Sequence, residues 1–65
     1  MNRPLAAGER RCLAELQEAY SPLSEPELAK TLGLRPTSTA RYLRTLRHLR
    51  LAVALDGSPR LWVAS

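Results

Sequence analysis

One segment, residues 36–50 (PTSTARYLRTLRHLR), constrains most strongly what this chain can fold into. At about 100° per residue along a helix, Thr39, Leu43 and Leu46 fall on one stripe. The opposite face carries polar and basic side chains, namely Thr37, Arg41, Arg44 and His48. No acidic residue occurs in the segment, although a face that only meets water usually mixes both signs of charge. The pattern predicts a helix over about 36–49 with a core-facing apolar stripe and an exposed basic face.

The charge of the chain is concentrated in its second half. Residues 1–34 carry four basic and five acidic side chains, whereas residues 35–65 carry six arginines and Asp56 as the one acid. Arginine, which supplies nine of the ten basic residues, suits phosphate and guanine better than lysine does, although a general bias toward arginine explains the composition equally well. The clustering indicates an anionic partner.

Two more helices are expected before this segment. Apolar residues recur at helical spacing over about 6–20, which predicts a first helix. Its buried face consists of Leu5, Cys12, Leu13, Leu16, and Ala19 or Tyr20. A second helix is predicted over about 24–32, because Ser24 and Glu27 form a capping-box pattern. Gly33 then provides a left-handed helix end, and Leu34 is expected to fill the angle between the second and third helices.

A β-hairpin is predicted over about 51–64, since two apolar segments flank an Asp56-Gly57 turn. Leu51, Val53 and Leu55 alternate as they would on one packed face of a strand. Because a two-stranded hairpin is marginally stable alone, a short third strand near Pro22-Leu23 is expected to join it.

The predicted fold is mainly α with a small β-hairpin (α+β), in one domain over residues 1–65. Residues 27–34 (ELAKTLGL) and 36–46 (PTSTARYLRTL) resemble the winged helix-turn-helix domains of bacterial transcriptional regulators of the MarR, ArsR and IclR types. That resemblance implies duplex DNA as the partner, with the third helix in the major groove and the hairpin on the flanking backbone or minor groove. Two positions depart from the pattern. Arg35 replaces a capping Ser or Thr, and Arg50 replaces a helix-ending Gly and would be strained if left-handed.

The candidate DNA-binding residues are Arg35, Thr37, Ser38, Arg41, Arg44, Thr45, His48 and Arg60. Ser38 and Arg41 lie near the start of the helix and are assigned to base edges, with Thr37 supporting a backbone contact. Arg44, Thr45 and His48 are assigned to phosphates or the groove wall. Arg60, beside the hairpin turn, is assigned to phosphate or the minor groove, or else is an exposed edge-strand charge.

Other side chains are predicted to contact phosphate or to support the fold rather than to contact bases. Because Arg35 is a poor cap, either Thr37 substitutes for it or Arg35 is retained for a phosphate contact. Tyr42 either bonds a phosphate or seals the core. Trp62 is expected to pack in the core or on the hairpin rather than stack on a nucleotide.

Two alternative functions remain open at this point. The basic face could bind an acidic protein in a transcription or replication complex. Residues 59–62 (PRLW) also resemble winged-helix domains that bind left-handed Z-form nucleic acid, but Ala40 and Arg44 stand where those domains have Asn and Tyr. A homodimer or a partner protein is possible in either case.

Several classes of function lack the residues they need. The sequence has no nucleophile–base pair, no paired carboxylates and no phosphate-binding Gly loop, so we predict no enzyme and no catalytic residue. His48 is the only histidine and lacks nearby ligands, so no metal or cofactor is expected. Cys12 fits a buried thiol in a reducing compartment. No apolar run suits a membrane span or secretory signal, which predicts a cytoplasmic protein, at the nucleoid when bound.

Overall fold

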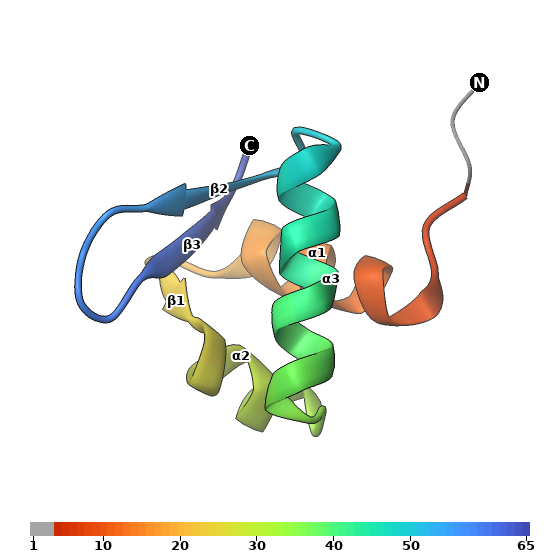
Figure 1. The fold of residues 1–65 in the computed structure, drawn as a ribbon, viewed down its shortest axis with the longest axis horizontal. Coiled ribbons are helices and arrows are strands. Elements are labelled where there is room, and N and C mark those ends of the chain that lie inside the picture. The colour runs from red at the N-terminus through yellow and green to blue at the C-terminus, as the bar shows by residue number, and fades with distance from the viewer. Residues whose placement is uncertain (1–3) are drawn as a thin grey trace.

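The computed structural model describes residues 4–65, which form three helices and one small sheet. The elements are α1 (Ala7–Glu18), β1 (Leu23–Ser24), α2 (Glu25–Leu32), α3 (Pro36–His48), β2 (Ala52–Leu55) and β3 (Leu61–Ala64) (Figure 1). Helix α1 ends two residues before the predicted Tyr20, and α3 ends one residue before the predicted end at 49. The order and content of elements confirm the mainly helical α+β class.

The sheet is antiparallel, with the strands in the order β1-β3-β2. Val53 pairs with Val63 across the hairpin, and Leu23 pairs with Trp62 on the other side of β3. The expected third strand near Pro22-Leu23 is therefore confirmed, although it is only two residues long. In Figure 1 the hairpin projects to one side of α3, while α1 passes behind α3.

The core lies where the three helices meet the inner side of the sheet. Its buried members are Cys12, Leu16, Leu28, Leu43, Leu46, Ala52 and Trp62. Thr39, Leu43 and Leu46 are each fully buried, which confirms the apolar stripe predicted for the third helix. Trp62 is also confirmed as a core residue, and its indole N–H has no hydrogen-bond partner among the described residues.

The predicted inner face of the hairpin is wrong for β2. Ala52 is 2% exposed, whereas Val53 is 44% and Leu55 is 37% exposed. The end of α3 determines which residues of β2 face the core. The Leu51 amide donates to the Leu46 carbonyl (2.8 Å) as part of the helix terminus, which fixes the orientation of the chain as it enters β2. Leu51 thus leaves the helix half-buried against the core, Ala52 follows under α3, and strand alternation turns Val53 outward.

The end of α1 decides between Ala19 and Tyr20, the two residues that the sequence left open for its buried face. Ala19 is already extended (φ −72°, ψ 139°), so the helical spacing that would bring Tyr20 inward is lost. Tyr20 is fully exposed, and Ala19 is half-buried instead.

The start of α2 confirms the predicted capping box. The Ser24 amide donates to Glu27 Oε1 (2.9 Å), and the Glu27 amide donates to Ser24 Oγ (3.3 Å). Hydrogen bonding from the Ser24 amide, and to a lesser extent from the Ser24 side chain, lowers the pKa of the Glu27 carboxyl below its usual value. At the other end, Gly33 adopts the predicted left-handed conformation (φ 66°). The turn that follows brings the chain directly into α3.

Candidate nucleic-acid interface

The orientation of α3 is fixed by its buried side. Leu43 and Leu46 lie in the core with no exposed surface. Thr39 is equally buried, and its hydroxyl donates to the Arg35 carbonyl oxygen at 2.9 Å, so the buried polar group is satisfied. Because this stripe faces inward, the other side of the helix is held toward solvent.

The structure places most of the predicted site residues on that outer side. Arg35, Thr37, Arg41, Arg44 and His48 are exposed. Ser38 and Thr45 are half-buried and lie at the flanks of the exposed face. Within residues 4–65, no ion pair neutralises an arginine of α3, so these cations remain available to an anionic partner.

Three of these residues line one shallow hollow on α3. Thr37, Arg41 and Arg44 surround it together with Ala40, and its volume is about 440 Å³. These residues lie three or four positions apart, which brings their side chains together on a helix surface. Ala40 was not among the DNA-binding residues predicted from the sequence. Its short side chain leaves space between the longer neighbours. The same i, i+3 and i+4 spacing was the available signal for it.

The N-terminus of α3 presents backbone donors beside this hollow. Arg35 occupies the N-cap position without a side-chain capping bond, as its sequence suggested, and Pro36 has no amide hydrogen. The amides of Thr37 and Ser38 precede the first intrahelical bond, which runs from the Thr39 amide to the Arg35 carbonyl. The positive end of the helix dipole thus lies next to the arginines.

The C-terminus of α3 controls where the hairpin begins. Arg50 is left-handed (φ 63°), so the predicted steric strain is present at this position. Its amide donates to the Arg47 carbonyl (3.0 Å), while the Leu51 amide reaches Leu46, which is a Schellman arrangement. The helix therefore ends in a common C-terminal motif, but Arg50 stands at the left-handed position that glycine usually occupies.

The remaining predicted residues lie apart from the hollow. Arg60 is exposed on the β2–β3 loop, on a different element from the other candidates. Tyr42 is half-buried, and its ring lies so close to α1 that a side chain on Gly8 would collide with it. The ring therefore seals the contact between α1 and α3.

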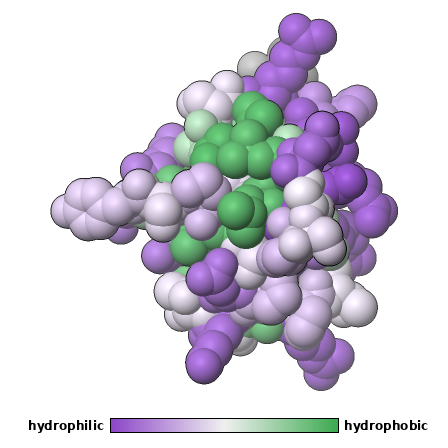
Figure 2. Space-filling model, turned by 90° about the vertical axis from the view of Figure 1, so that its left-hand side faces the viewer, coloured by the Kyte–Doolittle hydropathy of each residue, from purple (hydrophilic) through white to green (hydrophobic). Residues whose placement is uncertain are grey.

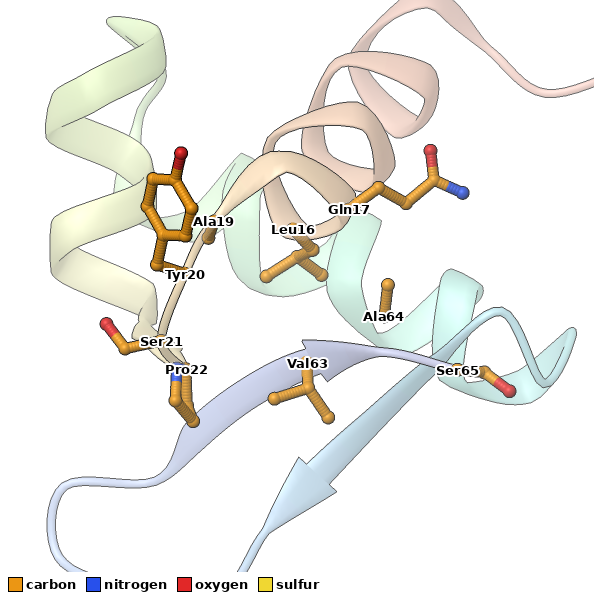
Figure 3. Close-up of a pocket in the computed structure, with 9 residues that line it drawn as sticks. All are labelled: Leu16, Gln17, Ala19, Tyr20, Ser21, Pro22, Val63, Ala64 and Ser65. Atoms are coloured by element: carbon orange, nitrogen blue, oxygen red, sulfur yellow. The ribbon is translucent and has the colours of Figure 1, made fainter.

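A second hollow lies between the end of α1, the loop before β1, and β3 (Figure 3). It is lined by Leu16, Gln17, Ala19, Tyr20, Ser21, Pro22, Val63, Ala64 and Ser65. This lining contains no acidic or basic side chain and none of the predicted site residues. It therefore offers no charged group for catalysis or for an anionic ligand.

Chemistry other than binding has little support in the described part of the chain. Burial raises the pKa of the Cys12 thiol, against a smaller lowering by Arg11, which disfavours a reactive thiolate. Among residues 4–65, no three His, Cys, Asp or Glu side chains gather as metal ligands would. None of the helices described there is long and apolar enough to cross a bilayer.

Comparisons with solved structures identify the architecture. The Zalpha domain of Carassius auratus PKZ, solved in complex with Z-DNA, superposes with a TM-score of 0.82 at 21% identity, over 89% of this chain and 92% of that chain. RV1404 from Mycobacterium tuberculosis superposes with a TM-score of 0.84 at 23% identity, over 94% of this chain but only 44% of that chain. The sequence matches no protein-family model and no curated protein sequence. From the element order and these two superpositions, the chain has a winged-helix fold.

Proposed function

We propose that this chain binds duplex DNA as a transcriptional regulator of the MarR, ArsR or IclR type. One observation carries the proposal: on the side opposite a fully buried stripe, α3 exposes arginines that form no ion pair with any residue of the described range 4–65. The core thus fixes which side of α3 faces solvent, so the arginines share one exposed face, which is the arrangement that a helix needs to enter a major groove.

The positions along α3 support a division of roles. Ser38 and Arg41 lie near the N-terminus, which is the end that usually meets base edges in this class of fold. Arg44, Thr45 and His48 lie further along and are assigned to phosphates or the groove wall. Thr37 and the uncapped amides beside it are suited to a backbone phosphate, because that end of the helix carries a partial positive charge.

Arg35 and Arg60 extend this surface beyond α3. Both side chains are exposed, one at the N-cap position and one on the hairpin loop. Arg35 would contact phosphate at the edge of the groove, and Arg60 would contact phosphate or the minor groove beside it. A small module of this kind covers about 600–1,000 Å² of protein surface on DNA.

Salt dependence of binding to a duplex tests the proposal. Fluorescence anisotropy with a labelled duplex should show affinity falling as salt rises, with a log–log slope of about −0.9 per neutralised phosphate. Arg41→Ala combined with Arg44→Ala should remove most of the binding and make the slope shallower by up to about two units. The fold should survive, since both side chains are exposed.

A matched control separates this face from general charge. Arg10→Ala combined with Lys30→Ala removes the same two charges from exposed positions on α1 and α2. This control should keep nearly all of the affinity, because long-range attraction between exposed charges is screened by salt. Equal losses in the two double variants would refute the α3 interface. No binding at the lowest salt would instead assign the arginine face to an acidic protein partner.

A second candidate function is binding to left-handed nucleic acid. The Zalpha domain that superposes on this chain was solved with Z-DNA, and residues 59–62 (PRLW) resemble the end of the hairpin in domains that bind the left-handed form. Against it, Ala40 and Arg44 replace the expected Asn and Tyr, and Trp62 is 3% exposed. Adding the protein to an alternating CG duplex and recording circular dichroism distinguishes the two functions. Conversion of the duplex to the left-handed form would favour this candidate over the first.

A further inference from the structure

The β2 strand has a free edge with backbone groups available for pairing. In the order β1-β3-β2 it has a neighbour on one side only. The Ser65 amide donates to the Leu51 carbonyl (3.0 Å), so these opposite residues form a hydrogen-bonded pair. Such pairs alternate along an antiparallel ladder, which assigns the amides and carbonyls of Val53 and Leu55 to β3. The amides and carbonyls of Ala52 and Ala54 therefore point away from the sheet, at its open edge.

The outer face beside this edge is aliphatic. Val53 and Leu55 are exposed, and their cross-strand partners Val63 and Leu61 are half-buried on the same face. Figure 3 shows that Val63 points away from α1, whereas Ala64 points toward it. Figure 2, which views the hairpin side of the molecule, shows a hydrophobic area in the middle of that side. Neither Pro nor a charged residue protects the strand, although edge strands usually carry such protection.

The sequence of this edge is complementary to itself. Residues 51–55 read Leu-Ala-Val-Ala-Leu in both directions. In an antiparallel pair centred on Val53, Ala52 of one copy lies opposite Ala54 of the other, and each Leu51 lies opposite Leu55. The free amides and carbonyls belong to Ala52 and Ala54, so they face each other in this register and form hydrogen-bonded pairs. The two Val53 side chains then meet in the closer, non-hydrogen-bonded pair on the outer face.

Charges at the two ends of the edge complement each other in the same register. Arg50 and Asp56 stand one residue beyond either end of residues 51–55. Both residues flank β2 (Ala52–Leu55) rather than belong to it, Arg50 at the terminus of α3 and Asp56 in the hairpin loop. Pairing about Val53 brings Arg50 of one copy to the end of the paired strands where Asp56 of the other copy lies, and the two-fold symmetry repeats this at the far end. Both residues are exposed in the isolated chain. Opposite charges facing each other across strands stabilise pairing, whereas like charges oppose it.

From the free edge, its palindromic sequence and its end charges, we propose that β2 is a homodimer interface that pairs with the β2 strand of a second copy. The two sheets then form one continuous antiparallel sheet about a two-fold axis through Val53. Because β2 has only four residues, we expect this contact to bury less than a standard interface of about 1,600 Å² and the dimer to be reversible and dependent on concentration. The inference does not depend on DNA binding, because β2 lies on a different element from the basic face of α3.

Sedimentation equilibrium without DNA tests the dimer over a hundredfold range of protein concentration. The unchanged chain should pass from monomer to dimer across this range. Val53→Lys places two ammonium groups at the closest cross-strand pair and should weaken dimerisation about tenfold or more. Gln17→Lys adds the same charge at an exposed position on α1 and should leave the dimer unchanged. A chain that stays monomeric throughout, or a Val53→Lys variant that dimerises normally, would overturn the proposal.

A charge exchange tests the register itself. Arg50→Asp and Asp56→Arg should each weaken the dimer, because each places like charges opposite each other at both ends. The chain with both changes restores opposite charges at both ends and should recover the dimerisation of the unchanged chain. Aspartate tolerates the left-handed conformation at position 50 better than most residues, so the helix end should persist, which circular dichroism can verify. Failure of the double exchange to restore dimerisation would rule out the register centred on Val53.

Discussion

Leu43→Ala is the sharpest test of how the basic face is held in place. Leu43 is fully buried between the helices and the sheet, and its removal deletes the equivalent of about three methylene groups, or about 2.4 kcal/mol of transfer free energy. The cavity that remains raises the expected loss to about 2.7–5.0 kcal/mol. At about 0.05–0.15 kcal/mol per residue, a chain of 65 residues unfolds with about 3–10 kcal/mol. The variant should therefore lose a large part of its stability.

Urea denaturation monitored by circular dichroism measures this loss of unfolding free energy. In a separate thermal melt, the Tm should fall by at least about 10 °C, since each kcal/mol lowers it by about 4–8 °C. Leu55→Ala is the matched control, since Leu55 is 37% exposed on the outer face of β2 and should cost only about 1 kcal/mol or less in dilute solution. Equal losses for the two leucines, or a loss below about 1 kcal/mol for Leu43→Ala, would refute the assignment of the buried side of α3.

Three further predictions concern the helix ends. Ser24→Ala should lower the free energy of unfolding by about 1 kcal/mol, measured in urea, because it removes the side-chain acceptor at the start of α2. Folding lowers the pKa of the Glu27 carboxyl, so its contribution to stability is complete above the usual pKa of a glutamate side chain and is lost as the pH falls through the folded pKa. Glu27→Gln should therefore flatten this acid dependence of the urea midpoint. Arg50→Gly should raise the unfolding free energy of the monomer by about 1 kcal/mol, because the left-handed position suits glycine; an unchanged or lower value would contradict the strain.

Periodicity was sufficient to predict which side of α3 is buried. Thr39, Leu43 and Leu46 fall on one stripe by the geometry of the helix alone, and all three are fully buried. The start of α2 was equally predictable, since the capping box depends only on residues three positions apart. Features of this kind are local, and the sequence specifies them wherever the helix forms.

The inner face of β2 was not predictable in the same way. Both sets of alternating residues are apolar there, so the pattern Leu-Ala-Val-Ala-Leu does not itself choose a face, and the larger side chains suggested the wrong one. The choice is made by the terminus of α3, which delivers Leu51 half-buried and leaves room under the helix for Ala52. That geometry depends on Arg50 adopting a positive φ, which its identity alone does not require.

The same ambiguity links the mistake about β2 to the proposed dimer. A strand that is apolar on both faces gains little by presenting Val53 and Leu55 to water. Since these side chains are 44% and 37% exposed, each forgoes about 1 kcal/mol of burial. In a second copy these residues find a partner of the same shape, while the alanines supply the backbone hydrogen bonds at the edge. An isolated monomer needs only one apolar face on β2, so the second face is explained by self-association. The arginines of α3, by contrast, form no ion pair within residues 4–65, which points to a partner other than a second copy.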